Sequence, residues 1–227
     1  MTSAEKRTVR SFVRRTGRMT RSQRRALDAL WPTYGLEFST EPLDFTAVFG
    51  RDSRRVLEIG FGNGDSLVEQ AARHRELDFI GVEVHWPGIG HCLIQAERAA
   101  LDNLRVISHD AIDVLQQQIG EATLDRVNLY FPDPWPKKRH HKRRILQPGF
   151  LGLLASRLAP GGSLHIATDW APYAEHIDGI LDSSPAFELA ERRAHGGDQP
   201  LDRPTTKFER RGLGKGHQIV DWRLVRI

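Results

Sequence analysis

Cysteine is almost absent from this sequence, because Cys92 is the only one among 227 residues. A single cysteine excludes an internal disulfide, and without a second cysteine a thiolate metal site is disfavoured. The histidines, including the adjacent His140 and His141, lack the spacing of a zinc site, so we expect no metal. Few cysteines also fit a reducing compartment, and we therefore expect a cytoplasmic protein.

Long apolar runs are missing as well. No stretch approaches the roughly 20 apolar residues that cross a bilayer, and the N-terminal region has no apolar segment of the kind found in signal sequences. Its many arginines and few acids also resemble a mitochondrial transit peptide, which stays open as an alternative. We therefore expect neither a membrane-spanning nor a secretory segment.

The excess of positive charge is small but clustered. The chain has 33 Lys and Arg against 29 Asp and Glu, and clustering matters more than the total for binding phosphates. Residues 1–25 carry eight arginines and one acid, Glu5, which predicts a mobile basic N-terminal arm ahead of one domain at residues 26–227. The arm is either a solvated tail or a contact for RNA. Apolar residues at helical spacing from Ala26 to Tyr34 predict a helix that docks on the domain.

Strand-like and helical segments alternate from Arg54 onward. Short apolar segments predict strands at residues 54–60, 78–84, 103–110, 125–131 and 163–169, with helical periodicity between them. Repeated units of this kind require a mostly parallel sheet with helices on both faces, so the sequence predicts a doubly wound three-layer α/β sandwich. Residues 187–193 and 218–227 predict two further strands, paired antiparallel and joined by a long polar loop at 194–216.

Three glycines follow the first predicted strand, in the sequence EIGFGNGD. Gly60, Gly62 and Gly64 let the backbone turn sharply and approach a ligand, but the dinucleotide-binding motif requires glycine where this chain has Asp65. A carboxylate there would repel a pyrophosphate, whereas Glu58 could face an ammonium group. The turn therefore favours a positively charged cofactor over NAD.

Acidic residues end the next two predicted strands. Glu83 has the spacing at which nucleotide-binding units place the acid that binds ribose hydroxyls, and Asp110 suits a contact to an adenine amino group. Each acid alone could equally be a helix N-cap or a solvated loop residue. Taken together with Glu58, they predict an anionic crevice at one edge of the sheet.

The segments LEIGFGNG, GVEVH and HDA resemble the successive motifs of class I methyltransferases that use S-adenosylmethionine. The sulfonium and ammonium groups of that cofactor explain why an acidic crevice is acceptable. The resemblance implies a Rossmann-like sheet of seven strands, mostly parallel, with an antiparallel C-terminal strand. It also implies a cofactor site, whose members are Glu58, Gly60, Gly62, Gly64, Glu83, Asp110 and, in the loop described next, Asp133.

The stretch YFPDPWPKKRHHKRR, residues 130–144, combines three prolines with a basic run. The prolines at 132, 134 and 136 exclude helix and stiffen the chain, because each fixes its own φ and favours extended geometry in the residue before it. Asp133 is therefore expected to be held rigidly. A fixed carboxylate beside a polycation predicts a planar, polyanionic substrate, and nucleic acid is the first candidate. Trp135 could stack on a base or cap the core.

Several segments together resemble the bacterial tRNA (guanine-N7)-methyltransferases. They are the proline-rich stretch, RMT at Arg18, EIGFGNG, PGIG at Pro87, TDW at Thr168 and TKFERRG at Thr206, and they span nearly the whole chain. The resemblance implies methyl transfer from S-adenosylmethionine to N7 of a guanine in the variable loop of tRNA, at position 46. tRNA is therefore the expected partner.

Roles for particular residues follow from that resemblance and from the basic run. Asp133 is the expected catalytic residue, and the substrate-binding positions are Lys137, Asp169, Thr206, Lys207, Phe208 and Glu209. The expected RNA contacts are Arg139, His140, His141, Lys142, Arg143 and Arg144, although a basic run can also be a solvated face. Guanine N7 has an in-plane lone pair, so Asp133 would orient the base and stabilise charge, without abstracting a proton.

Two alternatives remain at this point. One is a class I methyltransferase that acts on a small molecule, against which the basic run and the arm argue. The other is a non-catalytic RNA-binding protein with a vestigial crevice, against which the intact Glu58, Glu83 and Asp133 argue. A monomer and a homodimer are both compatible with the sequence.

Overall fold

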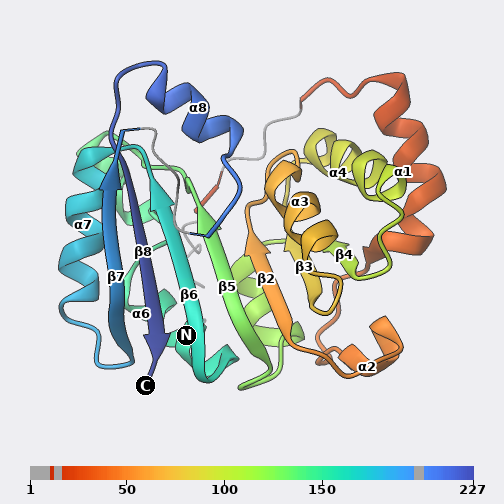
Figure 1. Cartoon of the computed structure of the whole chain (residues 1–227), viewed down its shortest axis with the longest axis horizontal. Helices are drawn as coiled ribbons and strands as arrows, with labels where there is room; N and C mark the ends of the chain where they lie inside the picture. Colours follow the sequence, from red (N-terminus) through yellow and green to blue (C-terminus); the bar gives the residue numbers. More distant parts are fainter. Residues whose placement is uncertain (1–10, 13–16, 197–201) are drawn as a thin grey trace, which may run out of the picture.

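One mixed sheet of eight strands forms the centre of the fold (Figure 1), in a computed structural model that describes residues 11–12, 17–196 and 202–227. The strands lie in the order β1-β4-β3-β2-β5-β6-β8-β7. Neighbouring strands are parallel except where β8 pairs with β6 and β7, so β8 runs against the rest. The prediction of a doubly wound sheet with an antiparallel C-terminal strand is confirmed.

The bounds of the elements show how strands and helices alternate. The strands are β1 (Gly35–Leu36), β2 (Arg55–Ile59), β3 (Asp78–Val82), β4 (Leu104–Ile107), β5 (Leu124–Tyr130), β6 (Leu158–Thr168), β7 (Phe187–His195) and β8 (Ile219–Arg226). The helices are α1 (Arg21–Tyr34), α2 (Phe45–Phe49), α3 (Asp65–Arg73), α4 (Trp86–Arg98), α5 (Ala111–Asp113), the π-helix η1 (Val114–Gln118), the 3₁₀-helix η2 (Lys138–Arg143), α6 (Pro148–Arg157), α7 (Ala171–Leu181) and α8 (Lys207–Leu213).

The predicted count of seven strands was one too low. The additional strand, β1, has two residues and pairs with β4 at the edge of the sheet. Two residues are too few to show the alternation by which a strand is recognised in a sequence.

Two predicted boundaries near the ends of the chain were also displaced. Helix α1 begins at Arg21, inside the predicted basic arm, because Thr20 and Gln23 form a capping box at its start; residues 1–10 and 13–16 of that arm lie outside the described residues. The predicted polar loop at 194–216 was wrong in part, because it contains α8. Thr206 and Glu209 form a second capping box, which begins this helix.

Side chains alternate between the two faces of the sheet and build a core on each. Leu57, Val127 and Ile166 belong to the core beneath α6 and α7, whereas Val56 and Phe79 belong to the core beneath α1, α3 and α4. The alternation is that of a strand buried on both faces. Within the described parts of the chain, no helix is long and apolar enough to cross a membrane.

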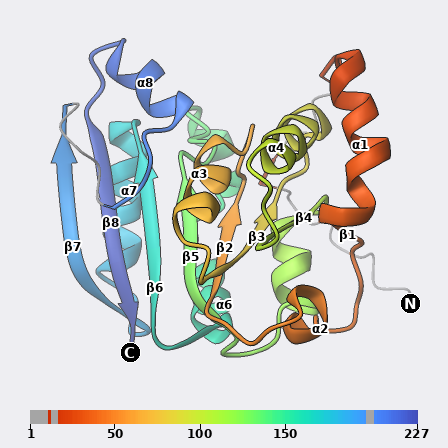
Figure 2. The same cartoon turned by 45° about the vertical axis from the view of Figure 1, so that its right-hand side comes forward.

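The carboxyl ends of the parallel strands meet at one edge of the sheet. Turning the molecule shows that α8 lies beyond the ends of β5 and β6 at this edge (Figures 1 and 2). Loops that follow parallel strands are where open α/β sheets bind their ligands. The fold therefore places residues 60–64, 83, 110 and 131–137 close together.

We predict that Gly90→Val loosens the docking of α1 on α4. A Cβ at Gly90 would lie 3.0 Å from both Cβ and the backbone oxygen of Gln23 in α1, so a branched side chain must push the helices apart. Overpacking of this kind costs about 1–3 kcal/mol, and the midpoint of thermal unfolding should fall. Gly152→Val is the matched control, because a Cβ there meets nothing within 4 Å; equal melting temperatures for the two variants would contradict the prediction.

Candidate active site

The turn between β2 and α3 contains three glycines. Gly60, Gly62 and Gly64 have φ of 70°, 61° and 82°, a conformation that other residues rarely adopt. The turn is packed tightly from behind, since a Cβ on Gly64 would lie 2.5 Å from Sγ of Cys92. A ligand in front of the turn therefore meets bare backbone.

Glu83 fastens this turn to the end of β3. Its Oε2 accepts a hydrogen bond from the N–H of Gly62 at 2.8 Å, and its Oε1 accepts from the N–H groups of Val84 and His85 at 2.6 and 3.0 Å. A carboxylate oxygen can accept more than one hydrogen bond. Oε2 can therefore hold the turn and still accept a hydrogen bond from a ligand hydroxyl.

A cavity of about 840 Å³, counting the open space at its mouth, lies at this edge of the sheet. Five of the seven predicted cofactor residues line it: Gly60, Gly62, Glu83, Asp110 and Asp133. Asp110 also caps α5, since its Oδ1 accepts from the N–H of Ile112 at 3.0 Å. The walls between these polar groups are apolar and aromatic, and include Ile59, Val82, Leu129, Tyr130, Phe131, Ile145 and Phe208. A mostly apolar lining with a few polar groups that converge on it is typical of a small-molecule site.

Glu58 is not among the residues that line the cavity. Its side chain is buried against α3, where Nε2 of Gln70 lies 3.4 Å from Oε2. Burial raises the pKa of Glu58 to about 8, although the charge of Arg203 and a hydrogen bond from Ser66 act in the opposite direction. In these surroundings the carboxyl group therefore holds its proton at neutral pH.

The proline loop after β5 holds Asp133 at the mouth of the cavity, exposed to solvent. Phe131 and Trp135, on either side of it, have positive φ of 52° and 44°, and strained backbone of this kind persists only where surrounding contacts enforce it. Two such contacts are hydrogen bonds, from Nε1 of Trp135 to the backbone oxygen of Ser11 at 3.0 Å and from Nε of Arg144 to that of Pro134 at 2.9 Å.

The basic run forms the 3₁₀-helix η2 and divides into exposed and anchored residues. Lys137, Arg139 and Lys142 are exposed, and His140 is half-buried. Arg143 lies over the ring of Trp135, with 5.1 Å from Cζ to the ring centroid. The exposed cations thus stand beside the loop that carries the catalytic candidate, where they can contact phosphates.

Arg144 lies apart from the other predicted RNA contacts because it is 3% exposed. Its guanidinium donates to the proline loop, lies 3.1 Å from Nε2 of His141 and stacks over Tyr173, with 4.9 Å from Cζ to the ring centroid. In this position Arg144 anchors the loop, and it does not present its charge to the surface.

The predicted substrate-binding residues of α8 point in different directions. Phe208 is 52% exposed and lines the cavity, and Lys207 is exposed. Glu209 is only 1% exposed, and Thr206 is bound to it in the capping box. Asp169, at the end of β6, accepts from the imidazole of His217, with 3.1 Å between Oδ2 and Nδ1. The structure therefore brings only Phe208 of this set, together with Asp133, to the cavity wall.

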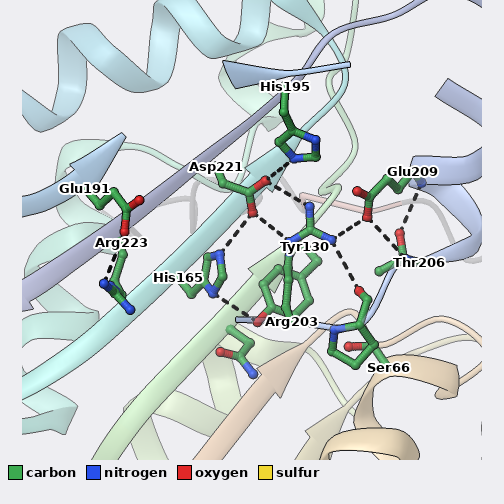
Figure 3. A network of polar contacts seen from close by, with 12 residues as sticks. Ser66, Tyr130, His165, Glu191, His195, Arg203, Thr206, Glu209, Asp221 and Arg223 are labelled. Atoms are coloured by element: carbon green, nitrogen blue, oxygen red, sulfur yellow. Dashed lines mark hydrogen bonds and ion pairs between the residues drawn. The ribbon is translucent and has the colours of Figure 1, made fainter. Parts of the chain in front are cut away.

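A buried polar network joins α8 to β5, β6 and β8 (Figure 3). At its centre, Asp221 accepts two hydrogen bonds from Arg203, at 2.7 and 2.9 Å, and is 3.0 Å from Nε2 of both His165 and His195. Burial alone would raise the pKa of Asp221, but the hydrogen bonds from His165 and Arg203 outweigh it and hold the pKa well below its usual range. Burial lowers the pKa of His165, although Asp221 acts in the opposite direction.

Sequence reasoning did not find this network or three residues of the cavity wall. Ser11, Phe12 and His109 line the cavity. His109 belongs to the HDA segment quoted above but was given no role, whereas nothing in the local sequence marks Ser11 and Phe12. Asp221 did carry a signal, because a carboxylate between Val220 and Trp222 in a buried strand requires a buried partner. Its partner, Arg203, lies in a loop and could not be identified from spacing. Among the described residues, no group of three His, Cys, Asp or Glu is placed to hold a metal ion.

Comparison with known sequences matches this chain to methyltransferases. Residues 52–222 match the model of the family described as "Putative methyltransferase". The tRNA (guanine-N(7)-)-methyltransferase of Alkalilimnicola ehrlichii is 54% identical over 218 residues, which cover 95% of this chain and 92% of that protein. The enzyme of the same name from Halorhodospira halophila is 53% identical, over 96% of this chain and 95% of that protein.

Comparison with solved structures agrees on the fold. The 16S rRNA (adenine(1408)-N(1))-methyltransferase of Catenulisporales acidiphilia, solved as a mutant with its cosubstrate SAM, superposes with a TM-score of 0.58 and 19% identity, over 81% of this chain and 90% of that one. At this identity the similarity extends to the fold alone. It confirms the predicted class of α/β sandwich.

We predict that Glu58→Gln flattens the dependence of stability on pH. The buried carboxyl group binds its proton until about pH 8, whereas the unfolded chain releases it near its ordinary value of 4.5. The free energy of unfolding of the native protein should therefore fall between these two pH values and level off above them. The variant has no such proton, so at pH 9 it should be more stable than the native protein by up to about 5 kcal/mol.

Urea unfolding at half-unit steps from pH 5 to pH 9 measures this effect. Glu69→Gln, on the exposed side of α3, is the control and should follow the native protein. If Glu58→Gln keeps the native slope with pH, Glu58 is ionised in the folded protein and the assignment is wrong.

Proposed function

The chain belongs to the family of tRNA (guanine-N7)-methyltransferases, and we propose that it transfers a methyl group from S-adenosylmethionine to N7 of guanine 46 in the variable loop of tRNA. Relatives of that name are about half identical to it over nearly its whole length, which confirms the resemblance drawn from the sequence motifs. The position in tRNA and the roles of individual residues belong to the proposal.

The observation that carries the proposal is the cavity at the carboxyl edge of the sheet. It combines a glycine turn, the carboxylate of Glu83 and the exposed carboxylate of Asp133 in one lining. Cations on Lys137, Arg139 and Lys142 stand beside it. The side of the cavity formed by the glycine turn and Glu83 therefore suits a nucleoside cofactor. The side formed by Asp133 and the neighbouring cations suits a base that is attached to phosphates.

The residues present fit S-adenosylmethionine. A Cβ on Gly88 would lie 2.0 Å from the backbone oxygen of Gly62, so the segment after β3 packs directly on the glycine turn. Gly60 and Gly62 of this turn line the cavity. Glu83 would hold the ribose hydroxyls, Asp110 the adenine amino group, and the glycine turn the methionine part. When bound, the cofactor supplies an electrophilic methyl group on a positively charged sulfur.

Asp133 would orient the guanine by accepting hydrogen bonds from its N1–H and amino group. N7 attacks through a lone pair that carries no proton, so the reaction needs positioning and charge stabilisation and no general base. A fixed carboxylate also lowers the energy of the base as it becomes positively charged. Adenine offers a different edge to the same carboxylate and would be rejected.

Phosphate contacts would come from the exposed residues Lys137, Arg139 and Lys142, with His140 and Arg143 beside them. We assign Arg144 to support of the proline loop, because it is buried. A cytoplasmic setting is proposed on the same basis, since tRNA is the substrate.

We predict that Asp133→Ala lowers kcat for tRNA methylation by at least about 100-fold, the loss expected when one charge-stabilising group is removed. The dissociation constant of S-adenosylhomocysteine should change far less, because the glycine turn and Glu83 remain. Single-turnover assays with digestion of the tRNA to nucleosides measure 7-methylguanosine directly. Asp182→Ala, at an exposed site after α7, is the control, and full activity of Asp133→Ala would exclude the assigned role.

We predict that replacing Arg139 and Lys142 together by glutamine raises KM for tRNA and makes it less dependent on salt. The logarithm of the association constant for tRNA falls as the logarithm of the salt concentration rises. Removal of one cation that binds a phosphate should make this slope less steep by roughly 0.7 to 0.9. The control replaces Arg73 and Arg98, which lie at the ends of α3 and α4, away from the cavity, and removes the same charge. Titrations of tRNA between about 50 and 200 mM salt measure the slope, and equal slopes for both double variants would refute phosphate binding by η2.

A further inference from the structure

Helix α8 is fixed across the carboxyl edge of the sheet by ion pairs that are buried at one end. Arg203 lies just before the helix and binds Glu209 within it, with 2.5 Å between Nη1 and Oε2. The same guanidinium holds Asp221 of β8 through two parallel hydrogen bonds. Figure 3 shows the three side chains together, and each of them is at most 1% exposed.

A buried cluster of this kind specifies geometry more than it adds stability. Ions lose their hydration when they are buried, and apolar residues of similar volume often stabilise a fold equally well. The planar guanidinium, however, binds carboxylates only in defined directions. Because Arg203 binds Asp221 in the sheet and Glu209 in the third position of the helix, it allows one placement of α8 on the sheet.

The other end of the helix is tied to β6. Asp169 accepts from Nδ1 of His217, three residues beyond the C-cap Gly214. Gly212 packs directly on Asp169, because a Cβ there would lie 2.7 Å from its Oδ2. A helix held at both ends has little freedom to move away from the cavity.

This placement brings Phe208 to the cofactor side of the cavity. Phe208 precedes the buried Glu209 and lines the cavity, while its ring reaches the glycine turn and comes within 3.6 Å of a Cβ built on Gly62. Successive residues of a helix point about 100° apart. Because Glu209 is fixed in the interior, the direction of the preceding side chain is fixed as well, and the ring of Phe208 lies against the glycine turn.

The same guanidinium also lies against the strand end that leads to Asp133. Its Cζ is 5.4 Å from the ring centroid of Tyr130 and 5.3 Å from that of Phe131. Both rings line the cavity. One buried cation is thus in contact with the wall of the cavity and with the helix that covers it.

We propose that Arg203 and Glu209 are positioning residues, which hold α8 so that the ring of Phe208 covers the cofactor on the glycine turn. The proposal rests on the proposed function, because it takes the ligand of the cavity to be S-adenosylmethionine. Glu209 then acts through Phe208 and does not touch the RNA. The apolar ring excludes water from the cofactor, and its loss increases cofactor dissociation.

A double-mutant cycle tests this coupling with cofactor binding as its readout. The dissociation constant of S-adenosylhomocysteine is measured by calorimetry, without tRNA, for the native protein, Glu209→Gln, Phe208→Ala and the double variant. Glutamine can keep the capping box but loses the charge that binds Arg203. Each single variant should bind roughly 10-fold more weakly, and the double variant no more weakly than Phe208→Ala, because residues that act through one contact are not additive.

Two controls separate positioning from loss of fold. Glu191→Gln removes a carboxylate from an exposed ion pair with Arg223, in the neighbouring strands β7 and β8, and should leave cofactor affinity unchanged. Circular dichroism and the melting temperature check that each variant is folded. If Glu209→Gln does not fold, Arg203→Lys replaces it in the cycle, because lysine keeps the charge but lacks the fork that holds two carboxylates.

The kinetic constants give a further readout. Under the proposal, Glu209→Gln raises KM for S-adenosylmethionine about 10-fold and leaves KM for tRNA within about twofold. Native cofactor affinity in Glu209→Gln with a raised KM for tRNA would overturn the proposal and assign Glu209 to RNA binding. Additive losses in the double variant would also overturn it. Failure of the native protein to bind S-adenosylhomocysteine would instead refute the proposed function, and this inference with it.

Discussion

The arrangement of the candidate site depends on one buried carboxylate, that of Asp221. It lies in β8 and is completely buried, and a charge in that position must be fully paired. Arg203, His165 and His195 supply its partners, and Arg203 brings Glu209 and helix α8 with it. Charge compensation inside the sheet thus determines which segment covers its carboxyl edge.

The cavity itself follows from a more general constraint of parallel sheets. Strands β2, β3, β4 and β5 all end at the same edge, so the glycine turn, Glu83, Asp110 and Asp133 meet there although they are far apart in the sequence. The turn is shaped by residues of positive φ, and the proline loop is fixed by hydrogen bonds that Trp135 and Arg144 donate. Cofactor and base would approach from opposite sides of one edge.

Much of the fold could be predicted because local patterns were strong. Apolar strands that alternate with helical segments gave the doubly wound sheet, and five of seven predicted cofactor residues lie at the cavity. The sequence did not reveal the position of a side chain where a tertiary partner determines it. Arg144 stands in a basic run yet is buried on Tyr173, Glu209 stands in a polar stretch yet is buried on Arg203, and Glu58 points toward α3. Helix α8 was missed although its capping box, Thr206 to Glu209, was readable in the sequence.

The most direct test of the account is to map the modified nucleotide. The purified protein is incubated with S-adenosylmethionine carrying a labelled methyl group and with tRNA that lacks 7-methylguanosine, and the RNA is then cleaved chemically at 7-methylguanosine. The account predicts label and cleavage at a single guanosine, position 46 of the variable loop. Label at another base or another atom of guanine, or no label although the protein binds S-adenosylhomocysteine, would contradict it.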